Sequence, residues 1–365
     1  MGLSLLQRIP HIGRFAAGTH NAITDVGRVT VGHATIDEGD VQTGVTVIRP
    51  HSGNLFMQKV PAGLAVINGF GKSAGLVQIE ELGVLETPIA LTNTFSVPAV
   101  TAAQIRQCVA QNPECGRSLP TVNALAMECN DGYLNDIQRM VVAAEHYDQA
   151  FADAQTVFPQ GAVGAGRGMS CFKLKGGIGS ASRVVSVAGV KALQEYTVGA
   201  LVLANFGQLH NLTVAGRNIG AQLAAHLAVK QDDHGMSGLE GGEQKDKGSI
   251  IMVMATDAPL DSRQLNRLAL RAAAGLARTG SYYGHGSGDI ALAFSTAYTI
   301  SQSADEVTPL SGVHFVRDEQ LDVFFEAVAD CVEQSVLCAL WHAQTVTGRS
   351  GHQRLSLSDA LALLS

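Results

Sequence analysis

The chain has 365 residues, 46% of them hydrophobic and 16% charged, with a net charge of -7. This composition predicts a well-packed globular protein, and its scattered basic residues argue against binding to nucleic acids or anionic membranes. No stretch has transmembrane length, and the first ten residues lack the features of a secretory signal, so a cytoplasmic protein is expected. The six cysteines have no CxxC or zinc-type spacing and are expected to be reduced core thiols.

The first 120 residues are predicted to form short strands and two helices. Alternating apolar residues or apolar runs predict strands over residues 29–33, 43–48, 59–68 and 87–93. A helix capped by Ser73 is expected to end at Gly83, and a second one is expected from about residue 98 to 111.

A strand predicted over residues 121–128 ends in a polar turn, residues 129–136. Glu128 therefore lies at the end of this strand, next to a loop, which is a common position for site residues. A functional carboxylate and a simple exposed strand end are both compatible with this pattern. A helix is expected over residues 139–154.

The middle of the chain combines a glycine-rich segment with two further strands. Residues 161–169 contain four glycines but match no phosphate-binding motif, so close backbone packing is the favoured interpretation. Strands are predicted over residues 183–188 and 196–205, and the second places Asn205 at its end.

The most informative stretch begins at Ser249. Residues 230–248 are mainly charged, polar or glycine and predict a flexible linker, whereas the five residues after Ser249 are large and apolar and predict a buried strand. A serine between a loop and a core strand suggests self-processing, in which its hydroxyl attacks the carbonyl of Gly248. The freed amine of Ser249 could then serve as base for its own hydroxyl. An ordinary Gly-Ser strand start is the alternative interpretation.

The last third is predicted to alternate helices and a strand. Helices are expected over residues 261–279 and about 319–345, with a short one near the C-terminus, and a strand follows Gly284–Asp289 and reaches about residue 297. No composition shift marks a domain boundary. We therefore expect one domain of sheets covered by helices, in which the Ser249 strand pairs with earlier strands.

Several segments together resemble one family, the DmpA-type L-aminopeptidase/D-Ala-esterase family, which includes the β-peptidyl aminopeptidases. The matching segments are NAITDV (21–26), TGVT (43–46), LTNT (91–94), ECNDGYLND (128–136), KGGIG (175–179), NFG (205–207), GSII (248–251), TDAPL (256–260) and GSGD (286–289).

This resemblance implies an α/β four-layer αββα sandwich, similar to N-terminal-nucleophile hydrolases. It also implies self-cleavage of the single domain 1–365 into an α-chain, 1–248, and a β-chain, 249–365. Members assemble as homotetramers of such heterodimers and use no metal or organic cofactor. They release N-terminal residues from small peptides, amides and esters.

The resemblance also implies roles for individual residues. Ser249 would be the nucleophile, first toward Gly248 and later toward substrate. Ser287 and Asp289 would orient this nucleophile and tune its proton transfer, and Asn205 would donate an N–H to the oxyanion. Each of these residues could instead have only a local structural role in a turn or strand start.

Residues that would contact the substrate follow from the same resemblance. Glu128 would pair with the free ammonium of the substrate. Some members carry an oxyanion-site tyrosine two residues after this glutamate, but here Asn130 occupies that position and Tyr133 lies three residues further on, so the second oxyanion donor stays open. His285, beside Ser287, is a candidate pocket residue, and the scattered histidines argue against a metal site.

Two other functions are also compatible with the sequence. One is an acyltransferase similar to ornithine acetyltransferase, although that class uses a threonine nucleophile where this chain has Ser249. The other is an unprocessed, non-catalytic relative that binds a small amino compound. Acetyl transfer from acetyl-ornithine to glutamate would indicate the first, and a persistently intact chain that binds ligand without turnover would indicate the second.

Overall fold

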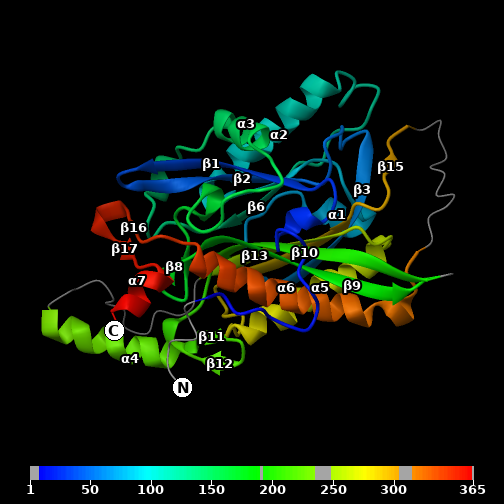
Figure 1. Cartoon of the computed structure of the whole chain (residues 1–365). Helices are drawn as coiled ribbons and strands as arrows, with labels where there is room; N and C mark the ends of the chain where they lie inside the picture. Colours follow the sequence, from blue (N-terminus) through cyan, green and yellow to red (C-terminus); the bar gives the residue numbers. More distant parts are fainter. Residues whose placement is uncertain (1–7, 190–191, 235–247, 304–314, 364–365) are drawn as a thin grey trace.

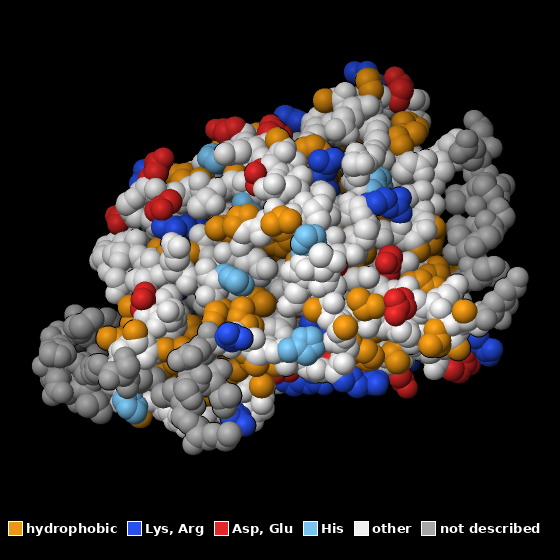
Figure 2. Space-filling model, in the orientation of Figure 1, with side chains coloured by type: hydrophobic (Ala, Val, Ile, Leu, Met, Phe, Trp, Pro, Cys, Tyr) orange, Lys and Arg blue, Asp and Glu red, His pale blue; other side chains and the backbone are white. Residues whose placement is uncertain are grey.

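The fold consists of two β-sheets that pack face to face, with helices covering the outer face of each (Figure 1). The computed structural model describes residues 8–189, 192–234, 248–303 and 315–363. Within these ranges, no helix combines the length and apolar character that spanning a membrane requires. Figure 2 shows acidic and basic side chains interspersed over the visible face.

The smaller sheet has four strands and is covered by two helices. In spatial order its strands are β1 (Thr30–Glu38), β2 (Val41–Arg49), β5 (Ile89–Asn93) and β6 (Leu125–Cys129). The last pair is parallel and the others are antiparallel. The covering helices are α2 (Val97–Gln111) and α3 (Ala144–Ala152). Val47 of β2 shares an apolar cluster with Val100 and Tyr147 of these helices.

The larger sheet has seven strands and contains the Ser249 strand near its centre. In spatial order they are β15 (Ile300–Ser301), β3 (Gln58–Gly69), β14 (Gly288–Ser295), β13 (Ser249–Thr256), β10 (Leu193–Asn205) and β9 (Gly177–Ala188), with β4 (Val84–Leu85) paired to β3. Only β13 and β14 run parallel. Its outer face is covered by α5 (Ser262–Arg278) and α6 (Asp322–Trp341).

Shorter elements connect these layers. They are α1 (Leu76–Leu82), α4 (Gly220–His234), α7 (Leu357–Ala362), the strand pairs β7 (Ser170–Cys171) with β8 (Leu174–Lys175), β11 (Thr213–Val214) with β12 (Arg217–Asn218), and β16 (Val346–Thr347) with β17 (Gln353–Arg354).

Strand β13 shows how the sequence produces the four layers. All eight of its residues are buried, as expected for a strand covered on both faces. Because successive side chains point to opposite faces, Met252 and Met254 pack in the cluster formed with α5 and α6, whereas Ile251 and Val253 pack toward the smaller sheet. The predicted αββα sandwich is therefore confirmed.

Several predicted boundaries were wrong. The N-cap of α1 is Gly75, not Ser73, and no side chain caps this helix. The strand expected from residue 121 begins only at Leu125, and α6 ends at Trp341 rather than near residue 345. Helix α4 was not predicted and includes residues 230–234, so the expected linker starts too early; residues 235–247 lie outside the described ranges.

The cysteines behave as the sequence analysis expected. All six are buried and none forms a disulfide. Cys331, for example, lies on α6 within the cluster between that helix and the larger sheet. Burial raises the pKa of its thiol to about 12, which is consistent with a packing role.

Candidate active site

Ser249 lies at the start of β13, where three strands bring distant parts of the chain together. The antiparallel pairing with β10 sets Ser249 opposite Asn205, and the parallel pairing with β14 sets it beside Gly288. The backbone N–H of Gly288 donates to Ser249 Oγ over 3.1 Å. This hydrogen bond orients the hydroxyl and favours the negative charge that Oγ develops when it loses its proton.

Gly248, directly before Ser249, is packed too closely for a side chain. A Cβ at this position would lie 2.4 Å from both the carbonyl oxygen of Asn205 and Cα of Phe206. These are backbone atoms of β10 and its end, so they cannot move aside without distorting the strand. The peptide bond before Ser249 is therefore held against the strand that carries Asn205.

Ser287 and Asp289 flank Gly288 and form a buried pair. Ser287 Oγ donates to Asp289 Oδ1 over 2.5 Å, and both residues are almost fully buried. The residue between them contacts Ser249 Oγ through its N–H, so this pair fixes the strand start that holds the nucleophile candidate.

Asn205 has a side chain held in one orientation at the end of β10. Its Oδ1 accepts the backbone N–H of Ser170 over 2.8 Å, and its Nδ2 donates to the carbonyl of Asn130 over 2.9 Å. Because an amide nitrogen carries two hydrogens, one N–H remains available for a negatively charged oxygen near Ser249. The fixed amide matches the requirements of an oxyanion donor.

Glu128, near the end of β6, is buried and oriented by two donors. Its Oε1 accepts the backbone N–H of Lys72 over 2.8 Å, and its Oε2 accepts the hydroxyl of Thr94. A carboxylate can accept about four hydrogen bonds, which leaves capacity for a ligand ammonium. Sequence analysis predicted Glu128 as a candidate, but it did not identify Lys72 or Thr94 as its partners.

Gly71 links Glu128 to the Ser249 region. A Cβ at Gly71 would lie 3.7 Å from Glu128 Oε1 and 4.0 Å from Cα of Gly288. The carboxylate from the smaller sheet and the strand start beside Ser249 thus approach each other across one glycine. Nothing in the sequence pattern singled out Gly71, because its position depends on how the two sheets pack.

Cys129 lies close to both carboxylates of the site. Burial, and then the charges of Glu128 and Asp289, raise the pKa of its thiol well above the usual value. Since the thiolate is the reactive form, Cys129 is unsuited to act as a nucleophile near neutral pH.

The other predicted substrate-binding residues differ in their relation to the site. Asn130 is exposed, and its Oδ1 accepts the N–H of Gly132 over 2.8 Å, so it reaches Asn205 through its carbonyl and not through its side chain. His285 is exposed near the ring of Phe70, with ring centroids 6.5 Å apart.

Tyr133 connects to Asn205 through residues that the sequence did not indicate. Its ring stacks on His352, and the guanidinium carbon of Arg354 lies 3.5 Å from the ring centroid. Arg354 Nε donates to Ser170 Oγ over 3.2 Å, and the backbone N–H of Ser170 holds Asn205. Tyr133 therefore contacts Asn205 only indirectly, through Arg354 and Ser170.

Comparison with known proteins agrees with the family resemblance seen in the sequence. A family model described as peptidase family S58 matches residues 21–354. A curated β-peptidyl aminopeptidase BapA from Sphingosinicella microcystinivorans is 38% identical over 369 residues, covering 98% of this chain and 90% of that protein.

Two solved structures match nearly the whole chain. The PH0078 protein from Pyrococcus horikoshii is 44% identical with a TM-score of 0.87, covering 100% of this chain and 98% of its own. The L-aminopeptidase D-Ala-esterase/amidase from Ochrobactrum anthropi is 34% identical with a TM-score of 0.84. The match covers 97% of this chain and 96% of that protein's chain. The latter is described as a prototype serine aminopeptidase with a variant of the Ntn-hydrolase fold.

Proposed function

The chain belongs to peptidase family S58, and from this premise we propose that it is a self-processing aminopeptidase with Ser249 as nucleophile. The observation that carries the proposal is the meeting of Ser249, Gly288 and Asn205 at one end of the larger sheet. Its substrates are peptides, amides or esters with a free N-terminal amine.

The first proposed step is cleavage of the chain itself. Ser249 Oγ attacks the carbonyl carbon of Gly248, and the peptide C–N bond breaks as an ester to Oγ forms. Water then hydrolyses this ester, which leaves a carboxylate on Gly248 and a free α-amine on Ser249. The close packing of Gly248 against β10 supports this step because it restricts the position of the attacked carbonyl.

The second step repeats this chemistry on substrate. The α-amine of Ser249 accepts the proton of its own hydroxyl as Oγ attacks the substrate carbonyl. An α-amine has a reference pKa of about 7.7–8.0 and is therefore largely protonated near neutral pH. Only its neutral form can accept the proton, so the site must hold the amine neutral. Asn205 stabilises the oxyanion through its remaining N–H. The amine or alcohol then leaves with a proton, and water releases the acyl group from Oγ.

Selection of N-terminal residues is assigned to Glu128. A substrate ammonium bound to this buried carboxylate lies across Gly71 from the strand start that holds Ser249. A substrate without the ammonium leaves the carboxylate buried and without its counter-charge, which is unfavourable. The enzyme therefore acts at chain ends that carry a free amine.

We also propose that cleavage gives an α-chain, 1–248, and a β-chain, 249–365. Four such pairs would assemble as a homotetramer. Four copies of the 38.2 kDa protein give about 150 kDa, which sedimentation equilibrium measures directly. A monomeric mass after processing would exclude the tetramer without affecting the assignment of Ser249.

A denaturing gel and N-terminal sequencing test the nucleophile. Scaling 38.2 kDa by 248 and 117 of 365 residues gives bands of about 26 and about 12 kDa, and the smaller should begin Ser-Ile-Ile-Met. Ser249→Ala should remain a single inactive band with a native circular dichroism spectrum. A cleaved Ser249→Ala protein, or a wild type that stays intact on incubation, would contradict the proposal.

A further inference from the structure

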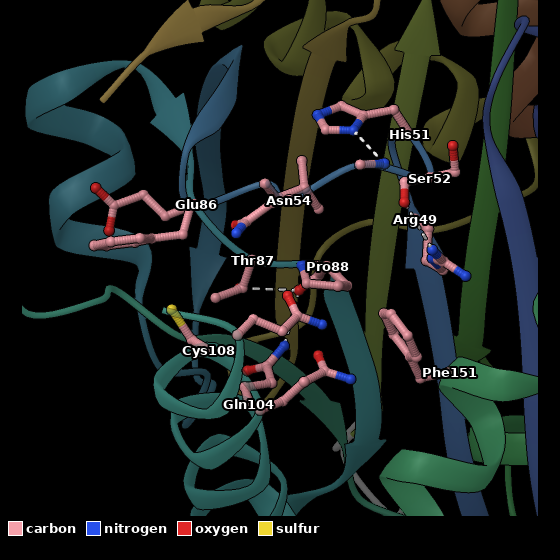
Figure 3. A pocket seen from close by; sticks show the side chains of 15 residues that line it. Arg49, His51, Ser52, Asn54, Glu86, Thr87, Pro88, Gln104, Cys108 and Phe151 are labelled. Carbon is pink, nitrogen blue, oxygen red and sulfur yellow. Dashed lines mark hydrogen bonds between the residues drawn. The ribbon is translucent and has the colours of Figure 1, made fainter. Parts of the chain in front are cut away.

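A cavity of about 410 Å³ lies at the opposite end of β5 from the candidate active site (Figure 3). Strand β5 begins at Ile89, next to the cavity residue Pro88, and ends at Asn93, next to the Glu128 partner Thr94. The second half of α2 forms one wall of the cavity. None of the residues proposed for catalysis or substrate binding lines it.

Arg49 provides a positive charge at this cavity without a partner carboxylate among the described residues. Its guanidinium carbon lies 4.2 Å from the centroid of the Phe151 ring, and Nη2 donates to the carbonyl of Ser52 over 3.3 Å. Partial burial lowers the pKa of this guanidinium, though an arginine stays charged. A guanidinium has five N–H donors, so most of them are free to bind an anion.

Other charges around the cavity are already balanced. Glu86 Oε1 lies 2.8 Å from Lys59 Nζ, and Glu86 Oε2 accepts the backbone N–H of Asn123 over 2.8 Å. His51 accepts the N–H of Gly53 at Nδ1, so its Nε2 carries the hydrogen and donates to the carbonyl of Gln58. Burial and then the nearby arginines lower the pKa of His51. Arg49 is therefore the charge that a ligand could neutralise.

The rest of the cavity supplies apolar surface and an amide donor. Leu55 and Phe56 are buried, and Phe151 packs under the guanidinium. Gln107 Oε1 accepts the hydroxyl of Tyr147 over 2.9 Å, which turns the amide so that its NH₂ group is the end left to bind a ligand. Apolar walls with a few placed polar groups are typical of small-molecule sites of this volume.

We propose that this cavity binds a small organic carboxylate with an apolar body, the carboxylate on Arg49 and the apolar part against Phe151 and Leu55. The fork of the guanidinium matches the two oxygens of a carboxylate. The volume of about 410 Å³ suits a molecule the size of an amino acid or dipeptide. This site is separate from the one assigned to substrate.

Calorimetric titration of the full chain tests the proposal. The probe is N-acetyl-L-phenylalanine, which has the carboxylate and an apolar body but lacks the ammonium that Glu128 would bind. We expect saturable binding by the wild type and a Kd raised at least about tenfold in Arg49→Met. Arg106→Met is the matched control, because Arg106 is exposed on α2 and does not line the cavity; its Kd should equal that of the wild type.

Two further titrations distinguish the ligand chemistry and guard against misfolding. N-acetyl-L-phenylalaninamide, which lacks the carboxylate, should not bind, and inorganic phosphate, which lacks the apolar body, should bind at least about tenfold more weakly than the probe. If Arg49→Met does not fold, Arg49→Lys replaces it and should raise Kd at least about threefold through loss of the fork. Absent binding, equal binding of the amide or phosphate, or an unchanged Kd in the Arg49 variant would overturn the proposal.

Discussion

At the scale of single residues, the environment distinguishes Ser249 from other serines at strand starts. Its Oγ accepts the N–H of Gly288, and a Cβ on the preceding Gly248 would collide with the backbone of Asn205. A Cβ at Gly288 would lie 2.8 Å from the carbonyl oxygen of Phe70, so close packing requires glycine at both positions. These contacts restrict the positions of the Ser249 hydroxyl and of the peptide bond before it, as the proposed self-cleavage requires.

Glu128→Gln tests the proposed ammonium anchor. The glutamine keeps an acceptor for the N–H of Lys72 but loses the negative charge, so KM for an amino-acid p-nitroanilide with a free amine should rise about 10- to 100-fold. Hydrolysis of an amine-blocked ester should not fall, because the variant no longer leaves a buried charge unpaired, and self-cleavage should continue. The exposed Glu81→Gln serves as control. Equal losses on free and blocked substrates would contradict the anchor role.

At the scale of elements, a buried carboxyl fastens the turn after β6 to β2. Asp131 accepts the hydroxyl of Thr43 over 2.6 Å and the side-chain N–H of Asn135 over 3.0 Å. Burial raises the pKa of this carboxyl to about 7, although these hydrogen bonds lower it. The turn that carries Asn130 and Tyr133 therefore depends on an acid that is protonated in the folded protein below about pH 7.

This carboxyl makes stability depend on pH. In the unfolded chain an aspartate has a pKa of about 3.9, so between about pH 4 and 7 the folded protein binds more protons at Asp131 than the unfolded one. Its contribution to the free energy of unfolding is present below this window and is lost as the pH rises to 7. Asp131→Asn should remove this dependence.

Urea midpoints measured from pH 4 to pH 8 check this prediction. The wild type should lose stability relative to Asp131→Asn between pH 4 and 7 and run parallel to it above pH 7. Asp136→Asn, in the same turn and only partly buried, should follow the wild type throughout. Parallel curves for the wild type and Asp131→Asn would show that Asp131 does not titrate in this window.

At the scale of the whole molecule, the proposed cleavage divides the sequence but not the fold. β13 pairs with β10 from the α-chain, and β14, from the same β-chain as β13, pairs with β3 from the α-chain. Helices α5 and α6 of the β-chain also cover the larger sheet, sharing one apolar cluster with β10. Because β15 of the β-chain also pairs with β3, separation would break three strand pairs and expose this core to water.

Cleaved protein should therefore elute from a size-exclusion column as one species containing both chains. The chains should separate only in denaturant, because the hydrophobic burial that joins them is intact after the peptide bond breaks. Uncleaved Ser249→Ala should elute at the same volume. Independent elution of the two chains under native conditions would contradict the interleaved arrangement.

The sequence by itself determined the strongly periodic elements and the chemical nature of the candidate site. The continuous apolar run after Ser249 predicted a buried strand, and the stripe of apolar residues over 261–279 predicted helix α5. Glu128 and Asn205 were identified as candidates because each is a polar residue at the end of an apolar run, a pattern that is visible in neighbouring residues of the sequence. Helix α4 and the true start of α1 were missed because their local sequence patterns are weak. In such segments, tertiary packing determines whether a helix forms and where it begins.

Only the tertiary structure decided which residues meet at the site. Lys72 and Thr94 orient Glu128, Ser170 orients Asn205, and Arg354 reaches Ser170 from a position 184 residues away in the chain. Such contacts follow from strand order and sheet packing, which residue spacing does not encode. The sequence therefore indicated the reactive groups, and the fold determined their partners, because hydrogen bonds depend on distance in space.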